Sequence, residues 1–148
     1  GLDIEIYDGV HPNPIEEDVT AGVTAFKSGK FEALVALGGG SAMDVAKTIR
    51  FMAVHKPPLS QYDDAIGGDK KIIHPLPPMY AIPTTAGTGS EVGRSSVITL
   101  PATGRKTIFF HPDLMPDIAV LDTSLTVGLP PQITSATGMD AFTHCLEA

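Results

Sequence analysis

Residues 31–55, FEALVALGGGSAMDVAKTIRFMAVH, decide the fold of this chain. The run from Phe31 to Leu37 is almost continuously apolar, which is typical of a β-strand covered on both faces. It ends in three glycines, Gly38 to Gly40. From Ser41 to His55 the apolar residues recur at helical spacing, and Pro57-Pro58 follows as a stop signal. The stretch therefore predicts a strand, a glycine turn and a helix.

The glycine turn is a candidate phosphate site. A glycine-rich turn between a buried strand and a helix lets backbone N–H groups approach a phosphate, with the positive end of the helix dipole behind them. Gly39, Gly40 and Ser41 fit this role. Asp44 lies three residues after Ser41, so the same letters also fit a capping box that only starts the helix. The turn alone leaves both interpretations open.

Three common site motifs do not match these letters. A Walker A loop needs Gly-Lys-Ser/Thr, but the residue before both Ser41 and Ser90 is glycine. A nucleophile elbow needs glycine two residues after its serine, where this chain has Met43, and Met43 also replaces the last glycine of the dinucleotide fingerprint. An NTPase, a serine hydrolase and an ordinary Rossmann site are therefore disfavoured.

The rest of the chain alternates predicted strands and helices. This alternation predicts an α/β fold with a Rossmann-like, mainly parallel sheet and flanking helices. The other elements expected from periodicity and turn residues are an edge strand at 3–10, a helix capped by Asn13 and ending at Ser28, a long surface loop at 57–78, a strand at 79–82, a hairpin of 97–100 with 107–110, a buried strand at 118–121 and a helix at 132–148.

The loop from Thr84 to Ser90 is a second candidate site. It carries four hydroxyl side chains and two glycines directly after a predicted strand. Ligands of open α/β sheets bind at the carboxyl ends of strands. A plain Thr/Gly connector would have the same letters, so this loop alone favours a site only weakly.

Asp140 and His144 are the candidate metal ligands. They are four residues apart in the last predicted helix, so they share one face. A carboxylate and an imidazole suit divalent Fe, Zn, Mn or Co. An exposed ion pair has the same spacing, and two ligands are too few for a tight catalytic site. The remaining histidines, which stand in loops or beside proline, are expected at the surface: His11, His55, His74 and His111.

Composition narrows the class of protein. The 148 residues are 43% apolar and carry a net charge of −7, which argues against nucleic acid or an anionic membrane as a partner. Cys145 is the single cysteine, and no apolar stretch reaches the roughly 18–20 residues that span a bilayer. A reducing, cytoplasmic location is expected, although a targeting segment could precede residue 1.

Four separated motifs resemble the iron-containing (group III) alcohol dehydrogenase family along essentially the whole chain. They are GGGSAMDVAK at 38–47, IPTTAGTGSEV at 82–92, PD through LD at 116–122 and TGMDAFTH at 137–144. The resemblance implies a nucleotide-binding α/β domain, here residues 1–128, and an all-helical metal-binding domain of which residues 129–148 are the first helix. It also implies that the chain is truncated at both ends and that the protein is a homo-oligomer, a dimer or higher.

The resemblance further implies a set of site residues. Gly39, Gly40 and Ser41 would contact the pyrophosphate of NAD or NADP, with Asp44 fixing the turn. Asp140 and His144 would hold Fe(II), or Zn or another divalent metal, together with later histidines. The remaining cofactor contacts would be Thr84, Thr85 and Thr88 on the phosphate and nicotinamide side, and Lys106 and Leu125 near the ribose and adenine.

The implied reaction is reversible oxidation of a small alcohol to an aldehyde, with hydride transfer to the nicotinamide. No residue of the chain is a clear general base. Two alternatives stay open: a nucleotide-binding fragment without catalysis, or another activity of the same scaffold, such as that of glycerol dehydrogenase, maleylacetate reductase or hydroxyacid-oxoacid transhydrogenase.

Overall fold

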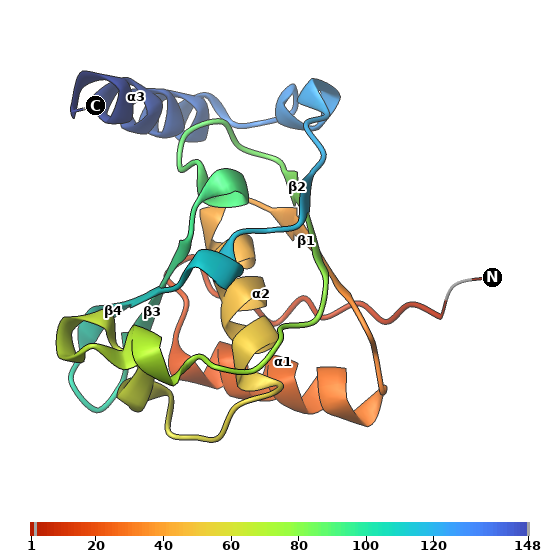
Figure 1. The fold of residues 1–148 in the computed structure, drawn as a ribbon. Helices are drawn as coiled ribbons and strands as arrows, with labels where there is room; N and C mark the ends of the chain where they lie inside the picture. The colour runs from red at the N-terminus through yellow and green to blue at the C-terminus, as the bar shows by residue number, and fades with distance from the viewer. Residues whose placement is uncertain (2, 148) are drawn as a thin grey trace.

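Helix α2, Gly40–Met52, runs through the centre of the α/β fold (Figure 1). The computed structural model describes residues 1 and 3–147. Every residue from Val45 to Met52 is buried, because α2 contacts helix α1 and strands β1, β2 and β3 around its circumference. Such a helix is apolar on most sides, which is why residues 41–55 predict it so clearly.

The strands form two sheets. Strands β1, Leu34–Gly38, β2, Met79–Pro83, and β5, Ile118–Ala119, make a parallel sheet in the order β1-β2-β5. Strands β3, Ser95–Leu100, and β4, Arg105–Phe110, form an antiparallel hairpin. The predicted parallel sheet and hairpin are confirmed, and so is the α/β class.

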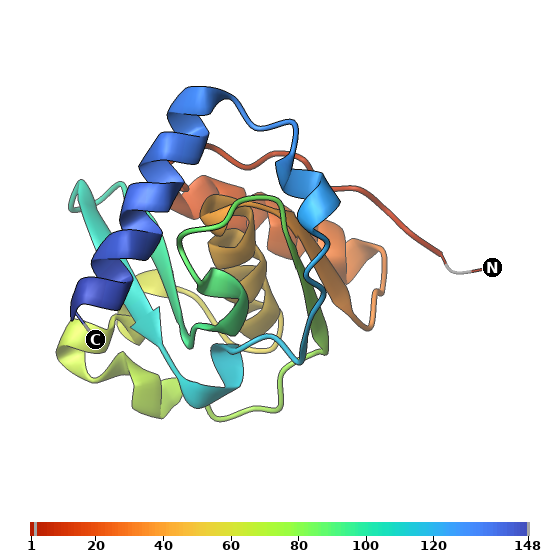
Figure 2. The same ribbon diagram turned by 90° about the horizontal axis from the view of Figure 1, so that it is seen from above.

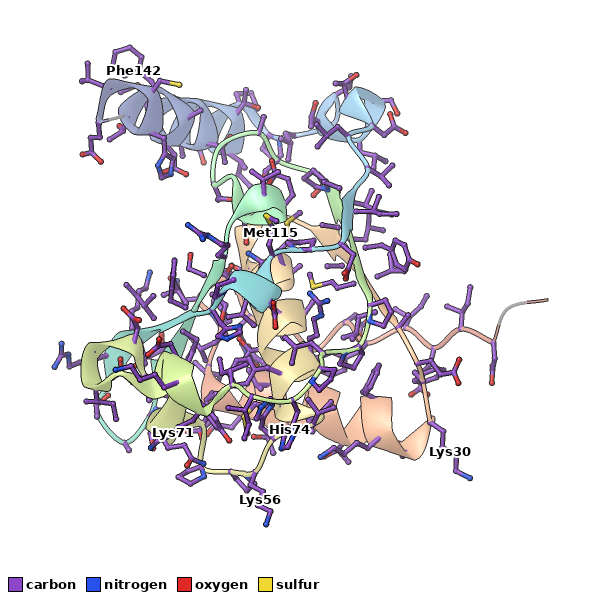
Figure 3. The ribbon with its side chains drawn as sticks, in the orientation of Figure 1. Lys30, Lys56, Lys71, His74, Met115 and Phe142 are labelled. Atoms are coloured by element: carbon purple, nitrogen blue, oxygen red, sulfur yellow. The ribbon has the colours of Figure 1, made fainter. Side chains whose placement is uncertain are left out.

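Two further helices flank this frame. Helix α1, Glu16–Ser28, packs against α2, whereas helix α3, Pro131–Glu147, lies across the top in Figure 1 and buries none of its described residues. Figure 2 shows from above that α3 crosses over the rest of the fold, and Figure 3 shows Phe142 on the side of α3 that points away from it. No helix in the described ranges is long and apolar enough to cross a membrane. The remaining elements are short 3-10 helices: Leu59–Tyr62, Asp64–Ile66, Gly68–Lys71, Ser90–Val92 (η4), Pro112–Leu114 and Thr123–Thr126 (η6).

The parallel sheet is covered on one face. Ala36 and Ala81 turn toward α2 and are buried, whereas Val35 and Leu37 on the other face are 64% and 60% exposed. The expectation that this strand is covered on both faces was therefore wrong for the described chain. The strand at 118–121 differs in the same way, because Ile118 is half exposed.

The N-terminal segment is not a strand. Residues 3–10 alternate in polarity as predicted, but they adopt no regular structure and pair with no strand of the described chain. Tyr7 fixes the segment instead, because its hydroxyl donates to the backbone oxygen of Asp18 at 2.7 Å. Ile6 is 85% exposed. Alternation indicates a strand only where a neighbouring strand supplies hydrogen bonds.

Helix α1 begins later than its predicted cap. Its cap residue is Ile15 rather than Asn13, and the Asp18 carboxylate accepts the Ile15 N–H at 3.2 Å. Residues before the helix are held elsewhere: Pro14 accepts the Thr99 N–H at 2.8 Å, next to a bridge between Ile15 and Thr99. Tertiary contacts with β3 thus displace the local capping signal.

Two other expectations need correction. The segment 57–78 is not purely a surface loop, because Leu59, Tyr62 and Ile72 belong to the main core cluster. His55 is buried rather than exposed: its Nδ1 donates to Phe51 O at 2.7 Å, and its Nε2 accepts backbone N–H groups from residues 73 and 74. Ala148, predicted at the end of the last helix, lies outside the described residues.

Candidate functional site

The glycine turn joins β1 to α2 at the carboxyl end of the parallel sheet. Gly38 has φ +149°, and a Cβ there would lie 2.7 Å from the Ala42 Cβ, so both the backbone and the close packing require glycine. The first turn of α2 carries no acidic side chain, whereas α1 begins with three carboxylates. The N–H groups and positive dipole end of α2 are therefore uncompensated, which suits an anion.

Gly39 caps α2 without any side-chain hydrogen bond, so the alternative of a Ser/Asp capping box is wrong. The Ser41 hydroxyl donates instead to Pro12 O at 2.7 Å. The Asp44 carboxylate accepts from the Ser90 hydroxyl at 2.8 Å and from the Val97 N–H at 3.1 Å. Both polar side chains of the expected box thus bind other segments.

The threonine loop, residues 84–90, rests directly on the glycine turn. Its start is fixed by the N–H of Thr84, which donates to Gly38 O at 2.9 Å. A Cβ at Gly39 would lie 3.2 Å from the Thr85 side chain, and one at Gly40 would lie 2.9 Å from Thr88 Cγ2. The loop therefore packs tightly on both glycines, and a larger residue at Gly40 would require Thr88 to move.

A buried lysine ties this loop to α2 and β3. The Lys47 side chain has no exposed surface, and its Nζ donates at 2.9 Å to the Ser90 hydroxyl, Gly93 O and Ser95 O. Burial lowers the pKa of Lys47 to about 8, although the negative charges of Asp44 and Glu91 oppose the shift. All three donors of the ammonium are used, so Lys47 has none to spare for a ligand.

The pKa of Asp44, the carboxylate whose charge acts on Lys47, shifts in the opposite direction. Burial raises the pKa of Asp44, while the hydrogen bond from Ser90, the charge of Lys47 and the Val97 N–H act against that rise. Sequence reasoning assigned no role to Lys47 or Ser90. The available signal was a lysine in the middle of a helix that is apolar at most of its positions, since a buried lysine needs partners.

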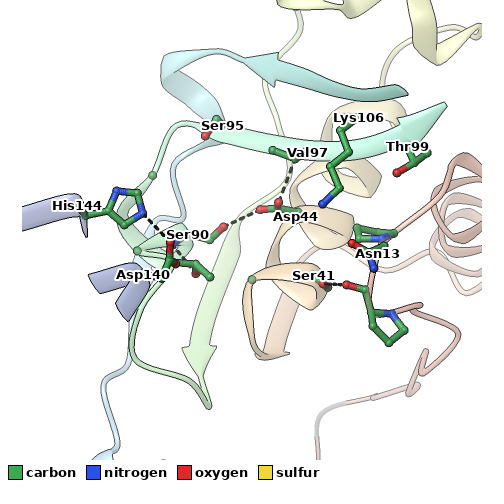
Figure 4. Close-up of a pocket in the computed structure, with 16 residues that line it drawn as sticks. Asn13, Ser41, Asp44, Ser90, Ser95, Val97, Thr99, Lys106, Asp140 and His144 are labelled. Carbon is green, nitrogen blue, oxygen red and sulfur yellow. Dashed lines mark hydrogen bonds and ion pairs between the residues drawn. The ribbon is translucent and has the colours of Figure 1, made fainter. Parts of the chain in front are cut away.

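A cleft of about 310 Å³ opens beside the glycine turn (Figure 4). Residues from the N-terminal segment, α2, the threonine loop, the hairpin and α3 line it. Seven of the predicted site residues are among them: Gly40, Ser41, Asp44, Thr88, Lys106, Asp140 and His144.

Four predicted residues lie outside the lining of this cleft. Gly39 and Thr85 contact one another just behind it, and Thr84 is bonded to the end of β1. Leu125 lies in η6 and is 40% exposed, away from the cleft residues. The cleft thus unites the glycine turn with the metal candidates but does not include the residue expected near the adenine.

Asp140 and His144 project from α3 into this cleft. His144 Nε2 lies 3.6 Å from Asp140 Oδ1, and their side chains are 62% and 44% exposed. The helix lies close to the threonine loop at Gly87, where an added Cβ would lie 2.5 Å from Thr137 O. The described residues contain no group of three metal-ligating side chains. The pair therefore supplies two donor atoms and needs others to complete a site.

A comparison with known protein families identifies the family of this chain. Residues 1–123 match the sequence model described as iron-containing alcohol dehydrogenase. The chain belongs to the iron-containing alcohol dehydrogenase family.

Individual iron-containing alcohol dehydrogenases agree with the family match. The chain is 43% identical over 147 residues to 4-hydroxybutyrate dehydrogenase of Cupriavidus necator, which aligns 99% of this chain with 38% of the relative. It superimposes with a TM-score of 0.90 and 39% identity on a solved 1,3-propanediol oxidoreductase, covering 96% of this chain and 36% of the other. The chain spans little more than a third of these relatives.

A third relative was solved with a cofactor. It is sulfoacetaldehyde reductase from Bifidobacterium kashiwanohense in complex with NAD+, which superimposes with a TM-score of 0.77 at 36% identity over 89% of this chain and 34% of the other. NAD and iron thus both occur in the family of iron-containing alcohol dehydrogenases.

Asp140 and His144 fit an iron ion as two of its ligands. Ligand atoms of a divalent metal lie about 2.0–2.2 Å from the ion, so two of them are separated by a little over 3 Å in a tetrahedral site. The separation of 3.6 Å between Nε2 and Oδ1 is close to this value without any rearrangement. An imidazole with a carboxylate is also a donor set that suits Fe(II).

Proposed function

We propose that the protein is an NAD(P)-dependent, iron-requiring alcohol dehydrogenase that interconverts small primary alcohols or diols and their aldehydes. The observation that carries this proposal is the cleft, because it brings an uncompensated helix N-terminus and a pair of metal-type ligands to one cavity. The 1,3-propanediol oxidoreductase among the relatives supports a small diol as one substrate.

The proposed role of each site residue follows from its position in the cleft. Gly39, Gly40 and Ser41 would bind the pyrophosphate through backbone N–H groups, and Thr88 would close the site from above. Lys106, on the hairpin wall of the cleft, would meet the ribose.

Asp140 and His144 would hold the metal at the other end of the cleft. When bound, that metal would polarise the alcohol oxygen as a Lewis acid. A dinucleotide held at the glycine turn would then accept a hydride from the carbon that bears this oxygen.

The test combines binding and turnover. NADH fluorescence titration should show saturable binding, and reduction of short aldehydes should cease after chelation and return with Fe(II) or Zn(II). Titration of NADPH beside NADH would settle cofactor choice, and light scattering would test the proposed homo-oligomer. Undiminished activity in a metal-free preparation would refute the metal role, and absence of dinucleotide binding would refute the whole assignment.

A second candidate function is dinucleotide binding without catalysis by the 148-residue chain alone. The observation that favours it is that two metal-type ligands from one exposed helix leave most of a coordination sphere to water. We expect weak NADH binding, little bound metal and no aldehyde reduction from a sample of verified mass. Turnover with stoichiometric, tightly bound metal would contradict this expectation.

A further inference from the structure

Helix α2 buries two cations on different sides of the fold. Lys47 faces the threonine loop and β3, whereas Arg50 faces the carbonyl groups of Pro77, Asp113 and Met115 and the carboxylate of Asp117. Both side chains are at most 5% exposed. The two cations thus crosslink α2 to separate segments.

Lys47 reaches the cleft through a short chain of hydrogen bonds. Its Nζ holds the Ser90 hydroxyl, and the Ser90 N–H donates to Thr88 Oγ1 at 3.2 Å. Thr88 is the side chain that covers Gly40. The position of the threonine over the glycine turn therefore depends on the lysine two contacts away.

The same ammonium also fixes the opposite wall of the cleft. Gly93 O and Ser95 O accept from Lys47 where the chain leaves η4 and enters β3. Two residues further, the Val97 N–H is bound by the Asp44 carboxylate. Gly93, Ser95 and Val97 all line the cleft. The buried Lys47 amino group therefore helps to set the width of the cleft from within the protein core.

We propose that Lys47 is a positioning residue for the cofactor: it holds the threonine loop and the start of β3 at the distance from the glycine turn that a dinucleotide pyrophosphate requires. This inference rests on the proposed function for its cofactor. Lys47 does not touch the ligand itself, because all its donors are bound to protein.

The decisive variant is Lys47→Met, which keeps an unbranched side chain one atom shorter but removes its charge and its donors. The Gly93 and Ser95 carbonyls would lose a buried partner, and the loop would shift toward water to satisfy them. Arg50→Met is the matched control, since it removes a second buried cation from the same helix without a residue of the cleft among its partners. Ser90→Ala removes the hydroxyl that links Lys47 to Asp44 and keeps the backbone N–H that donates to Thr88 Oγ1.

Two readouts separate positioning from general stability. We expect Lys47→Met to weaken NADH binding between about ten- and a hundredfold in fluorescence titration, because a loop that is correctly placed in only about 1–10% of molecules raises the apparent Kd by that factor. Amide hydrogen exchange of residues 88–93, measured without cofactor, should become faster. Arg50→Met should lower Tm yet leave both the Kd for NADH and this local exchange unchanged. Ser90→Ala should shift both readouts in the direction of Lys47→Met.

The outcomes discriminate between the explanations. An unchanged Kd and unchanged local exchange in Lys47→Met would overturn the inference, and so would equal changes in Lys47→Met and Arg50→Met. If Lys47→Met does not fold, Ser90→Ala decides by the same criteria. If the unaltered protein does not bind NADH, the proposed function fails, whereas the exchange of residues 88–93 still tests whether Lys47 holds the loop.

Discussion

Replacing Gly40 by alanine tests whether the threonine loop presses on the glycine turn. The added Cβ would lie 2.9 Å from Thr88 Cγ2 and 3.2 Å from its Oγ1, closer than the contact distance of about 3.5–4.0 Å. Overpacking of this kind costs about 1–3 kcal/mol, and the better helix propensity of alanine returns at most about 1 kcal/mol. We expect a net loss of about 1 kcal/mol in the free energy of unfolding, or about 3 °C in Tm.

A double-mutant cycle identifies the cause of that loss. Thr88→Ser removes Cγ2 and keeps the hydroxyl that the Ser90 N–H uses. In this background Gly40→Ala should cost less, because the contact with Cγ2 is gone while the 3.2 Å contact with Oγ1 stays, and denaturant titrations should give a coupling energy of at least about 0.5 kcal/mol. Gly39→Ala is the control, because its Cβ would meet Thr85 instead, and Thr88→Ser should not rescue it. Equal costs of Gly40→Ala in both backgrounds would refute the contact.

Three further predictions concern other parts of the fold. Burial lowers the pKa of His55, so the unfolded chain binds a proton first as the pH falls, and the free energy of unfolding should be full above about pH 6.5 and decline below it. His55→Gln should flatten this pH dependence in denaturant titrations, and an unchanged dependence would contradict the assignment. Gly87→Val would drive a side chain into Thr137 O and should loosen α3, seen as faster hydrogen exchange of α3; unaltered exchange would mean that the two do not touch. Phe51→Ala should cost about 3–5 kcal/mol, because this side chain is fully buried, and a loss under about 1 kcal/mol would show that the core is not built around it.

The sequence predicts well wherever a pattern is local. The apolar run before Gly38 and the helical spacing after it give β1 and α2 directly, and the turn letters around Thr103 give the hairpin. The signal for residues 3–10 was local too, yet those residues form no strand, because no strand of the described chain pairs with them. A strand is a property of a pair, which one segment alone does not encode.

The candidate site was predictable to a similar degree. Glycines, threonines and the Asp140–His144 spacing pointed to residues that line one cleft. The polar contacts behind them did not follow from spacing, because the Lys47 contacts span 43 to 48 residues of sequence. The capping-box interpretation of Ser41 and Asp44 was wrong for the same reason, since distant partners outcompeted the local one.

Strand β1 also affects how the chain behaves at high concentration. In the order β1-β2-β5 it is an edge strand, and no strand of the described chain pairs with its outer side. The exposed Val35 and Leu37 on its open face add apolar surface next to that edge. An edge of this kind is a template for intermolecular β-pairing unless something covers it, and charges beside it, such as Glu32, oppose such growth. Strand β1, which leads into the glycine turn, is thus also an edge at which intermolecular pairing would begin.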